Sequence, residues 1–256
     1  MVFEKWYLDC VTPEGAGMIG YVARLGWGSL GLKLAETLCW NATGGGCDRL
    51  ALGGSWPVES PDEVHWESAA ARTEGRWRRL APGLAPTVLH AEPAGRIEWT
   101  CCCPAARATV LVHRTRYDGL GYAEHLRMTL PPERLPLQEL HWGRFIAESQ
   151  TCVWIRWGGR AESRWFFHNG QAVDAAVLAG DDLTWPGYRL HLERGVAVRS
   201  GRLGETVFQR AAFLRHLVPA GLVNVRETKW CSRGVLAEEG GRRHAGWAIH
   251  EIAVFP

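Results

Sequence analysis

Fourteen of the 256 residues are tryptophan, and their placement constrains the fold more than any other feature. Many lie in short segments in which apolar and polar residues alternate, the pattern of half-buried strands. Clusters of Gly, Pro, Asn and Asp separate these segments at short intervals, as in β-sandwiches and barrels. Asn169-Gly170, which follows the apolar run Trp165-Phe166-Phe167, is the clearest signal for a tight hairpin. The predicted strands include Glu4–Cys10, Val64–Ala70, Arg96–Cys101, Thr151–Trp157, Arg164–Phe167 and Gly246–Phe255.

Helical patterns are scarce in this chain. Two segments, Ser29–Leu38 and Val207–Val218, carry apolar residues at the spacing of an amphipathic helix. Strand patterns dominate elsewhere. We therefore predict an all-β protein with one or two short helices.

A proline-rich segment, residues 131–136, divides the chain near its middle. Proline cannot donate a hydrogen bond to a sheet, so such a run ends a strand and begins a connection. We expect an N-terminal domain of residues 1–130 and a C-terminal domain of residues 137–256. A faint internal echo, Leu25-Gly26-Trp27-Gly28 against Leu140-His141-Trp142-Gly143, agrees with two related halves.

Composition and charge exclude several classes of protein. The net charge of +2 is nearly neutral, so the composition gives no indication of nucleic-acid binding. No run of about 18 apolar residues is present, so we expect no transmembrane helix. The opening residues, MVFEKWYLDC, do not resemble a secretory signal. Eight cysteines without an export signal favour reduced thiols and a cytoplasmic location.

The sequence offers no convincing motif for a metal or an organic cofactor. Cys101, Cys102 and Cys103 are adjacent, and successive residues of a strand point to opposite faces, so they cannot chelate one ion well. No Cys-x2-Cys pair occurs, and the histidines lack metal spacing. Residues 26–31 match a dinucleotide-binding pattern in letters only, because no βαβ unit follows. We expect neither metal nor cofactor.

The segment Gly121–Leu130 carries the first candidate acid. On a strand, Glu124 shares one face with Tyr122, Leu126 and Met128. A carboxylate on an apolar face loses hydration, which favours its neutral form and suits a general acid. The alternative is a purely structural Glu124, at a strand edge or paired with a buried arginine.

The C-terminal strand repeats this arrangement. Within Gly246–Phe255, Glu251 shares a face with Trp247 and Ile249, and His250 falls on the opposite face. If both strands face one cavity, Glu124 and Glu251 act as acid and base or share a proton. Alternatively, one carboxylate pairs with Arg144 or Arg156. Asp9, beside Tyr7 in the first strand, is a third candidate for an interior carboxylate.

Four short segments carry a resemblance to a known family: Lys5–Asp9, Gly121–Glu124, Leu135–Phe145 and Gly246–Glu251. Together they resemble the carotenoid 1,2-hydratase (hydroxyneurosporene synthase) family, which belongs to a wider lipocalin-like group with two-domain cyclases. The resemblance implies two lipocalin-like β-barrel or sandwich halves. It also implies cofactor-independent chemistry on a hydrophobic polyene, isoprenoid or polyketide-like substrate.

Three functional hypotheses follow. In the first, the protein is a hydratase, isomerase or cyclase that protonates an alkene, and aromatic faces stabilise the developing cation. In the second, it only binds a pigment, lipid or hydrophobic metabolite in the same cavity. In the third, the tryptophans merely fill two small cores. The predicted catalytic residues are Glu124, Glu251 and Asp9, and the predicted ligand-binding residues are Tyr122, Trp99, Trp142, Arg144, Trp154 and Trp247.

Overall fold

A computed structural model describes residues 1–27, 30–159, 162–207 and 220–256. Its described residues form two compact units that divide between Leu135 and Pro136. Each unit contains one ten-stranded antiparallel sheet, and the two sheets have the same strand order when ten is added to each strand number. The prediction of an all-β chain with two related halves is therefore confirmed, and each half is a curled, lipocalin-like sheet.

The N-terminal sheet has the order β4-β3-β2-β1-β10-β9-β7-β6-β5, and β8 pairs with β9 beside this path. The first and last strands of the half, β1 and β10, therefore lie side by side at its centre. The strands are β1 (Val2–Val11), β2 (Gly17–Trp27), β3 (Leu30–Trp40), β4 (Gly46–Leu52), β5 (Val58–Glu59), β6 (Glu63–Ser68), β7 (Thr73–Arg79), β8 (Thr87–Glu92), β9 (Gly95–Val112) and β10 (Thr115–Met128).

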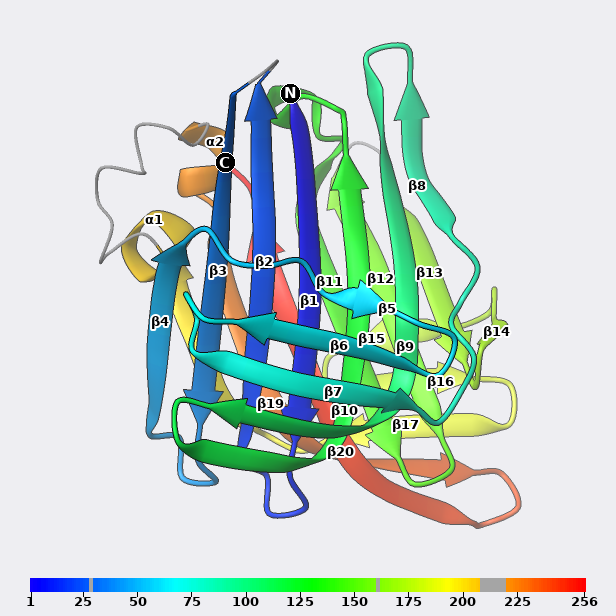
Figure 1. Cartoon of the computed structure of the whole chain (residues 1–256). Coiled ribbons are helices and arrows are strands. Elements are labelled where there is room, and N and C mark those ends of the chain that lie inside the picture. Colours follow the sequence, from blue (N-terminus) through cyan, green and yellow to red (C-terminus); the bar gives the residue numbers. More distant parts are fainter. Residues whose placement is uncertain (28–29, 160–161, 208–219) are drawn as a thin grey trace. The chain divides into compact units, whose positions relative to one another are not determined.

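This sheet folds back over itself. Figure 1 shows β6 and β7 crossing steeply in front of β1 and β2. The crossing needs close approach, and glycine provides it: a Cβ on Gly20 of β2 would lie 2.4 Å from the Trp66 ring of β6. Trp66 and Trp77 are fully buried in the core that results, together with Leu8, Val22 and Ala123 among others. These indoles fill the core, as the third hypothesis expects of tryptophan.

The C-terminal sheet has the order β14-β13-β12-β11-β20-β19-β17-β16-β15, and β18 pairs with β19 beside this path. Its core contains Phe145, Trp154, Phe166 and Trp185. The strands are β11 (Leu137–Ala147), β12 (Thr151–Gly159), β13 (Ser163–His168), β14 (Gln171–Ala172), β15 (Val177–Ala179), β16 (Asp182–Trp185), β17 (Tyr188–Leu192), β18 (Val196–Arg202), β19 (Arg226–Glu238) and β20 (Arg243–Val254).

Helices are short in the described residues, and one predicted helix is wrong. The two α-helices, α1 (Leu203–Thr206) and α2 (Ala220–Val223), have four residues each, and a 3₁₀ turn, η1 (Pro132–Arg134), lies in the proline-rich connection. The predicted helix at Ser29–Leu38 is instead strand β3, which pairs with β2 on one side and β4 on the other. Sheet pairing on both sides overrides a weak helical spacing. The helix predicted at Val207–Val218 lies almost wholly outside the described residues.

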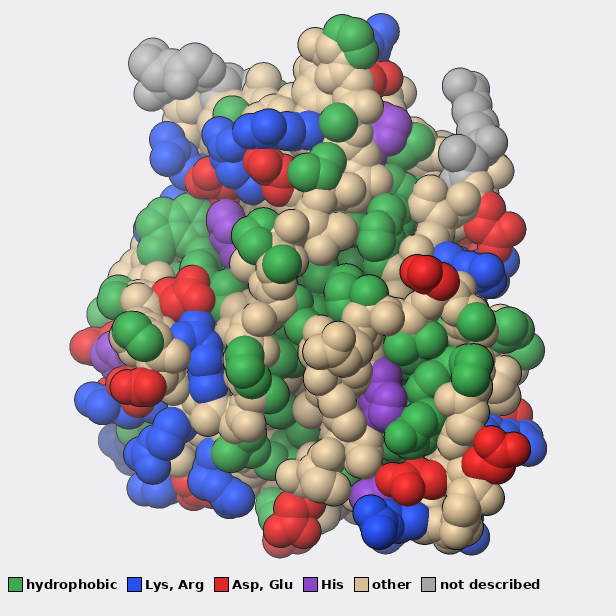
Figure 2. Space-filling model, turned by 90° about the vertical axis from the view of Figure 1, so that its right-hand side faces the viewer, with side chains coloured by type: hydrophobic (Ala, Val, Ile, Leu, Met, Phe, Trp, Pro, Cys, Tyr) green, Lys and Arg blue, Asp and Glu red, His purple; other side chains and the backbone are tan. Residues whose placement is uncertain are grey.

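Within the described part of the chain, no helix is long and apolar enough to cross a membrane. On the face that Figure 2 shows, acidic and basic side chains are interspersed, with hydrophobic side chains between them. This face therefore shows no broad patch of a single charge.

Candidate functional site

Two tyrosines and two carboxylates lie together at the centre of the N-terminal sheet. Tyr7 and Asp9 belong to β1, and Tyr122 and Glu124 belong to β10. The register places Tyr7 opposite Glu124 and Asp9 opposite Tyr122. Side chains opposite each other on paired strands share a face, so these four residues form one patch, the tyrosine–carboxylate cluster. All four side chains are buried.

The cluster lies on the face opposite the N-terminal core. Leu8 alternates with Tyr7 and Asp9 along β1, and Ala123 alternates with Tyr122 and Glu124 along β10. Leu8 and Ala123 belong to the core formed with Trp66 and Trp77. The sheet is thus buried on both faces here, with a hydrocarbon core on one face and ionisable groups on the other.

Hydrogen bonds hold both carboxylates in place. The Tyr7 hydroxyl donates to Asp9 Oδ2 at 2.9 Å, and the Tyr122 hydroxyl donates to Glu124 Oε2 at 2.8 Å. Trp99 of β9 donates from Nε1 to the same Oε2 of Glu124 at 2.6 Å. Two donors on one oxygen fix the orientation of the Glu124 carboxyl group, which is the kind of preorganisation that proton transfer requires.

Burial sets the protonation of the groups beside Glu124. It raises the pKa of the Tyr122 hydroxyl well above its ordinary value, and Cys101 and Glu124 add to the effect. Tyr122 therefore stays protonated and remains a donor at neutral pH. Burial also raises the pKa of the Cys101 thiol, which faces Glu124 from β9. Since the thiolate is the reactive form, Cys101 is not set up as a nucleophile.

Glu251 has a different environment in the C-terminal sheet. It lies opposite Trp142 of β11 on one side and opposite Lys229 of β19 on the other. The Lys229 ammonium forms an ion pair with Glu251 and a second one, at 3.3 Å, with Glu227. It also lies over the Trp142 ring, 5.4 Å from the centroid. Lys229 is fully buried, so the ion pairs compensate a charge that has lost its hydration.

The sequence suggests Arg144 or Arg156 as an ion-pair partner for a buried carboxylate such as Glu251. In the structure the partner of Glu251 is Lys229. Arg156 instead pairs with Glu162 at 3.0 Å, and the buried Arg144 donates from Nη1 to the backbone oxygen of Trp247 at 2.8 Å. Lys229 is absent from the predicted site because its segment, Arg226–Lys229, is mostly polar and looks solvent-exposed.

The predicted wall residues lie in both sheets, and those of the C-terminal sheet do not share one face. Trp99 lies in the N-terminal sheet beside Glu124. In the C-terminal sheet, Trp142 shares a face with Glu251, because the two are register partners. Trp154 instead lies opposite Gly143, on the core face. Trp247 is half-buried and lies next to Arg144 through its backbone oxygen.

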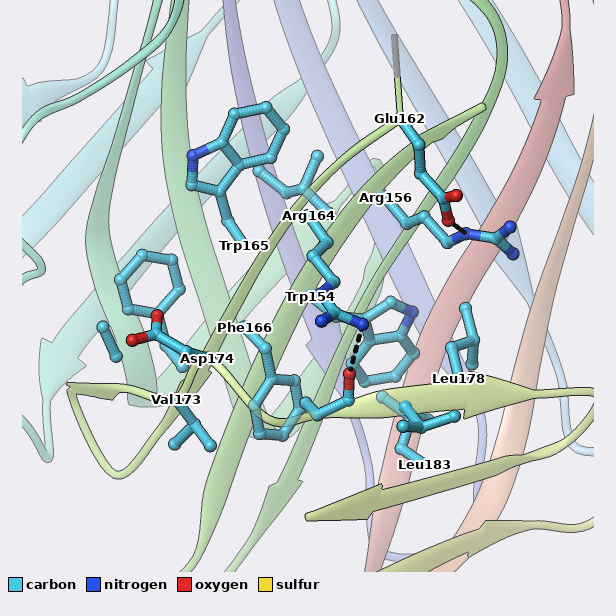
Figure 3. Close-up of a pocket in the computed structure, with 15 residues that line it drawn as sticks. Trp154, Arg156, Glu162, Arg164, Trp165, Phe166, Val173, Asp174, Leu178 and Leu183 are labelled. Atoms are coloured by element: carbon cyan, nitrogen blue, oxygen red, sulfur yellow. Dashed lines mark hydrogen bonds and ion pairs between the residues drawn. The ribbon is translucent and has the colours of Figure 1, made fainter. Parts of the chain in front are cut away.

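Trp154 lines a cavity of about 430 Å³ at the edge of the C-terminal sheet (Figure 3). Aromatic and aliphatic side chains form most of its wall, including Phe166 and Leu183. Figure 3 shows Arg164 reaching across it, where Nη1 donates to the backbone oxygen of Ala176 at 3.3 Å. Its volume lies within the range of small-molecule sites.

A search of the described residues finds no group of three or more His, Cys, Asp or Glu side chains placed to hold a metal ion. The buried, hydrogen-bonded groups of the tyrosine–carboxylate cluster are the clearest chemical feature of the N-terminal half. Proton transfer by Glu124 is the chemistry that this arrangement suits best.

Comparison with protein-family models gives no match, and comparison with the sequences of curated proteins gives none either.

Solved structures, in contrast, resemble the chain over nearly its whole length. The crystal structure of CghA with Sch210972 has a TM-score of 0.63 at 12% identity, covering 99% of this chain and 88% of that chain. Kievitone hydratase from Nectria haematococca has a TM-score of 0.53 at 9% identity, covering 98% and 88%. An ATTH protein from Nitrosomonas europaea has a TM-score of 0.52 at 10% identity, covering 97% and 92%. At these identities the likeness establishes the two-half fold.

Proposed function

We propose that this protein is a cofactor-independent acid–base enzyme, a lyase or an isomerase/cyclase, that acts on a hydrophobic polyene, isoprenoid or polyketide-like substrate. The observation that carries the proposal is the buried Glu124, which is held through one oxygen by Trp99 and Tyr122. The fold supports it, since a protein of the same fold is named a hydratase. The sequence resemblance supports the finer assignment to the carotenoid 1,2-hydratase-like family. The eight cysteines support a cytoplasmic location, where thiols stay reduced.

The proposed reaction begins with proton transfer from the Glu124 carboxyl group to an alkene carbon. This forms a carbocation on the neighbouring carbon, and the faces of nearby aromatic rings stabilise it. In a hydration, a water oxygen bonds to the cation and the surplus proton returns to Glu124, so that the net change is addition of water. In an isomerisation, a neighbouring C–H bond loses the proton instead. Either route regenerates the acid.

We propose Asp9 as the acid–base partner of Glu124. It lies in the same buried cluster, on the adjacent strand, and its orientation is fixed by the Tyr7 hydroxyl. The ion pair between Glu251 and Lys229 supports a structural role for Glu251, in place of the acid or base role that the sequence suggests.

The experiment is deuterium incorporation in D₂O. Wild type, Glu124→Gln and a control, Glu98→Gln, are incubated with a panel of acyclic polyenes and isoprenoids, and the products are analysed by mass spectrometry. Glu98 is a partly exposed carboxylate on β9, paired with Arg127. We expect Glu124→Gln to lose about 10²–10⁴-fold in the rate of incorporation. Quenching of tryptophan fluorescence by the same compounds should be unchanged, because Gln preserves the shape of the side chain.

Each outcome has a defined meaning. Full incorporation by Glu124→Gln removes Glu124 from the role of acid. If the compounds quench tryptophan fluorescence but wild type incorporates no deuterium, the enzyme proposal is wrong. The alternative is then a binding protein for a pigment, lipid or hydrophobic metabolite, which the aromatic cavity of Figure 3 supports.

A further inference from the structure

A second cavity, of about 300 Å³, opens inside the curl of the C-terminal sheet. Its lining combines aromatic and aliphatic side chains, charged side chains, and a hydroxyl and an imidazole that are hydrogen-bonded to each other. Ser232 of β19 and His250 of β20 supply these polar groups, and Trp154, Trp230 and Leu192 are among the apolar ones. All these residues belong to the C-terminal half.

Ser232 and His250 form a hydrogen-bonded pair. Ser232 Oγ lies 2.9 Å from His250 Nε2, and Ser232 is fully buried. Burial, opposed by Asp181 and assisted by Lys229, lowers the pKa of His250 to about 4. The imidazole is therefore neutral at pH 7. Whichever of the two groups donates, the serine oxygen keeps an acceptor lone pair and the neutral imidazole keeps its other nitrogen as a polar group.

Indole rings flank this pair. The Trp230 ring is stacked on His250, with ring centroids 5.2 Å apart and planes at 21°. The Trp154 ring occupies space next to Gly143, where a Cβ would lie 2.1 Å from the indole and 2.9 Å from the Cβ of His250. Gly143 therefore allows Trp154 and His250 to approach each other across β11. Flat rings placed around a small polar pair suit a planar aromatic molecule.

Fixed charges lie at the rim of this cavity. Asp181, Glu193 and Arg194 line it, and all three residues are exposed to solvent. Glu251 also lines the cavity and is mostly buried, but its charge is compensated by the ion pair with Lys229. An ionic molecule would therefore lose hydration in the buried part without an uncompensated partner of opposite charge.

We propose that this cavity, the serine–histidine pocket, binds a neutral, planar aromatic molecule that carries a hydroxyl group. The hydroxyl donates to the Ser232–His250 pair, and the ring lies against the indoles of Trp154 and Trp230. The pocket goes beyond the proposed acid–base function, because it uses residues of the other half and transfers no proton. An imidazole with a pKa of about 4 is too weak a base to activate Ser232 at neutral pH.

The test uses three probes of one size: 2-naphthol, naphthalene and 2-naphthoate. Binding to the whole protein at pH 7 is measured by isothermal titration calorimetry. We expect 2-naphthol to bind more tightly than naphthalene and 2-naphthoate. Ser232→Ala should weaken the binding of 2-naphthol by roughly threefold to tenfold, the effect of one hydrogen bond, and leave that of naphthalene unchanged. Ser200→Ala, which removes a hydroxyl from the exposed end of β18, is the matched control.

A second measurement uses only the wild-type protein, so its result does not depend on whether a variant folds. In wild type, 2-naphthol should shift the ring-proton resonances of His250 in a ¹³C-edited NMR titration. The proposal is overturned if those resonances do not move, if 2-naphthol binds no more tightly than naphthalene, or if Ser232→Ala binds 2-naphthol as wild type does. Glu124→Gln should bind 2-naphthol normally, so failure of the acid–base proposal is distinguishable from failure of this one.

Discussion

At the scale of single residues, the buried ion pair of Lys229 and Glu251 affects the free energy of unfolding. Lys229 exposes 2% of its side chain and Glu251 exposes 13%. Removing one partner of such a pair leaves the other charge buried, which is costly, whereas removing both partners is often close to neutral. The pair is therefore a place where single and double substitutions should differ sharply.

We predict that Lys229→Met lowers the free energy of unfolding by about 3 kcal/mol, and that adding Glu251→Gln restores part of this loss. Urea denaturation of the single and double variants measures it. Arg156→Met is the control, since its ion pair with Glu162 is exposed and should contribute less than about 1 kcal/mol. A double variant less stable than Lys229→Met would contradict the assignment of Glu251 as a structural partner.

The site could be predicted from the sequence only where one strand contains the information. Alternation along β10 places Tyr122 and Glu124 on one face, and the register confirms that they share it. The donation from Trp99 to Glu124 joins two strands, and so does the pairing of Ser232 with His250. Contacts of this kind depend on register, which a single sequence does not show.

At the scale of strands, the repeat suggested by the sequence matches two strands that do not correspond in the two sheets. Leu25–Trp27 lies at the end of β2, whereas Leu140–Gly143 lies within β11. Adding ten to a strand number makes β12, not β11, the counterpart of β2. The end of β12, Arg156-Trp157-Gly158-Gly159, is thus the counterpart of Leu25-Gly26-Trp27. Similar letters indicated two halves correctly, but the topology was needed to match the strands.

Strand β11 also contains a glycine that a side chain cannot replace without rearrangement. We predict that Gly143→Ala lowers the free energy of unfolding by about 1–3 kcal/mol, because its Cβ would overlap the Trp154 indole. The same substitution should cost less in a Trp154→Leu background, which removes the overlapping ring. A double-mutant cycle by urea denaturation measures the difference.

Gly158→Ala in the neighbouring strand β12 is the matched control, since its Cβ would lie 3.5 Å from the nearest atom, at ordinary contact distance. We expect it to have little effect. Equal losses for Gly143→Ala with and without the Trp154 indole would show that backbone effects, and not overlap, decide the cost.

At the scale of the whole molecule, the described strand pairings of each sheet all lie within its own half. The described ladders of the N-terminal sheet involve β1 to β10, and those of the C-terminal sheet involve β11 to β20. We propose that the connection at residues 131–136 is therefore dispensable for both sheets.

We predict that a protease site inserted between Leu135 and Pro136 can be cut with little change in the far-ultraviolet circular dichroism of the protein. The reason is that cutting there leaves every described strand pairing intact. The uncut protein with the same insertion is the control. Loss of a large part of the β signal on cutting would mean that one half depends on its covalent link to the other.

The pairing of β1 with β10 has a consequence for synthesis of the chain on the ribosome. The strand that emerges first needs, on one of its edges, the strand that emerges last in its half. About a hundred residues separate them, which ribosomes take roughly 5–20 s to add. During that interval the carboxylate of Asp9 and the backbone edge of β1 lack the neighbours that later enclose them. Nascent-chain chaperones then matter more for this protein than for one whose strands pair in the order in which they are made.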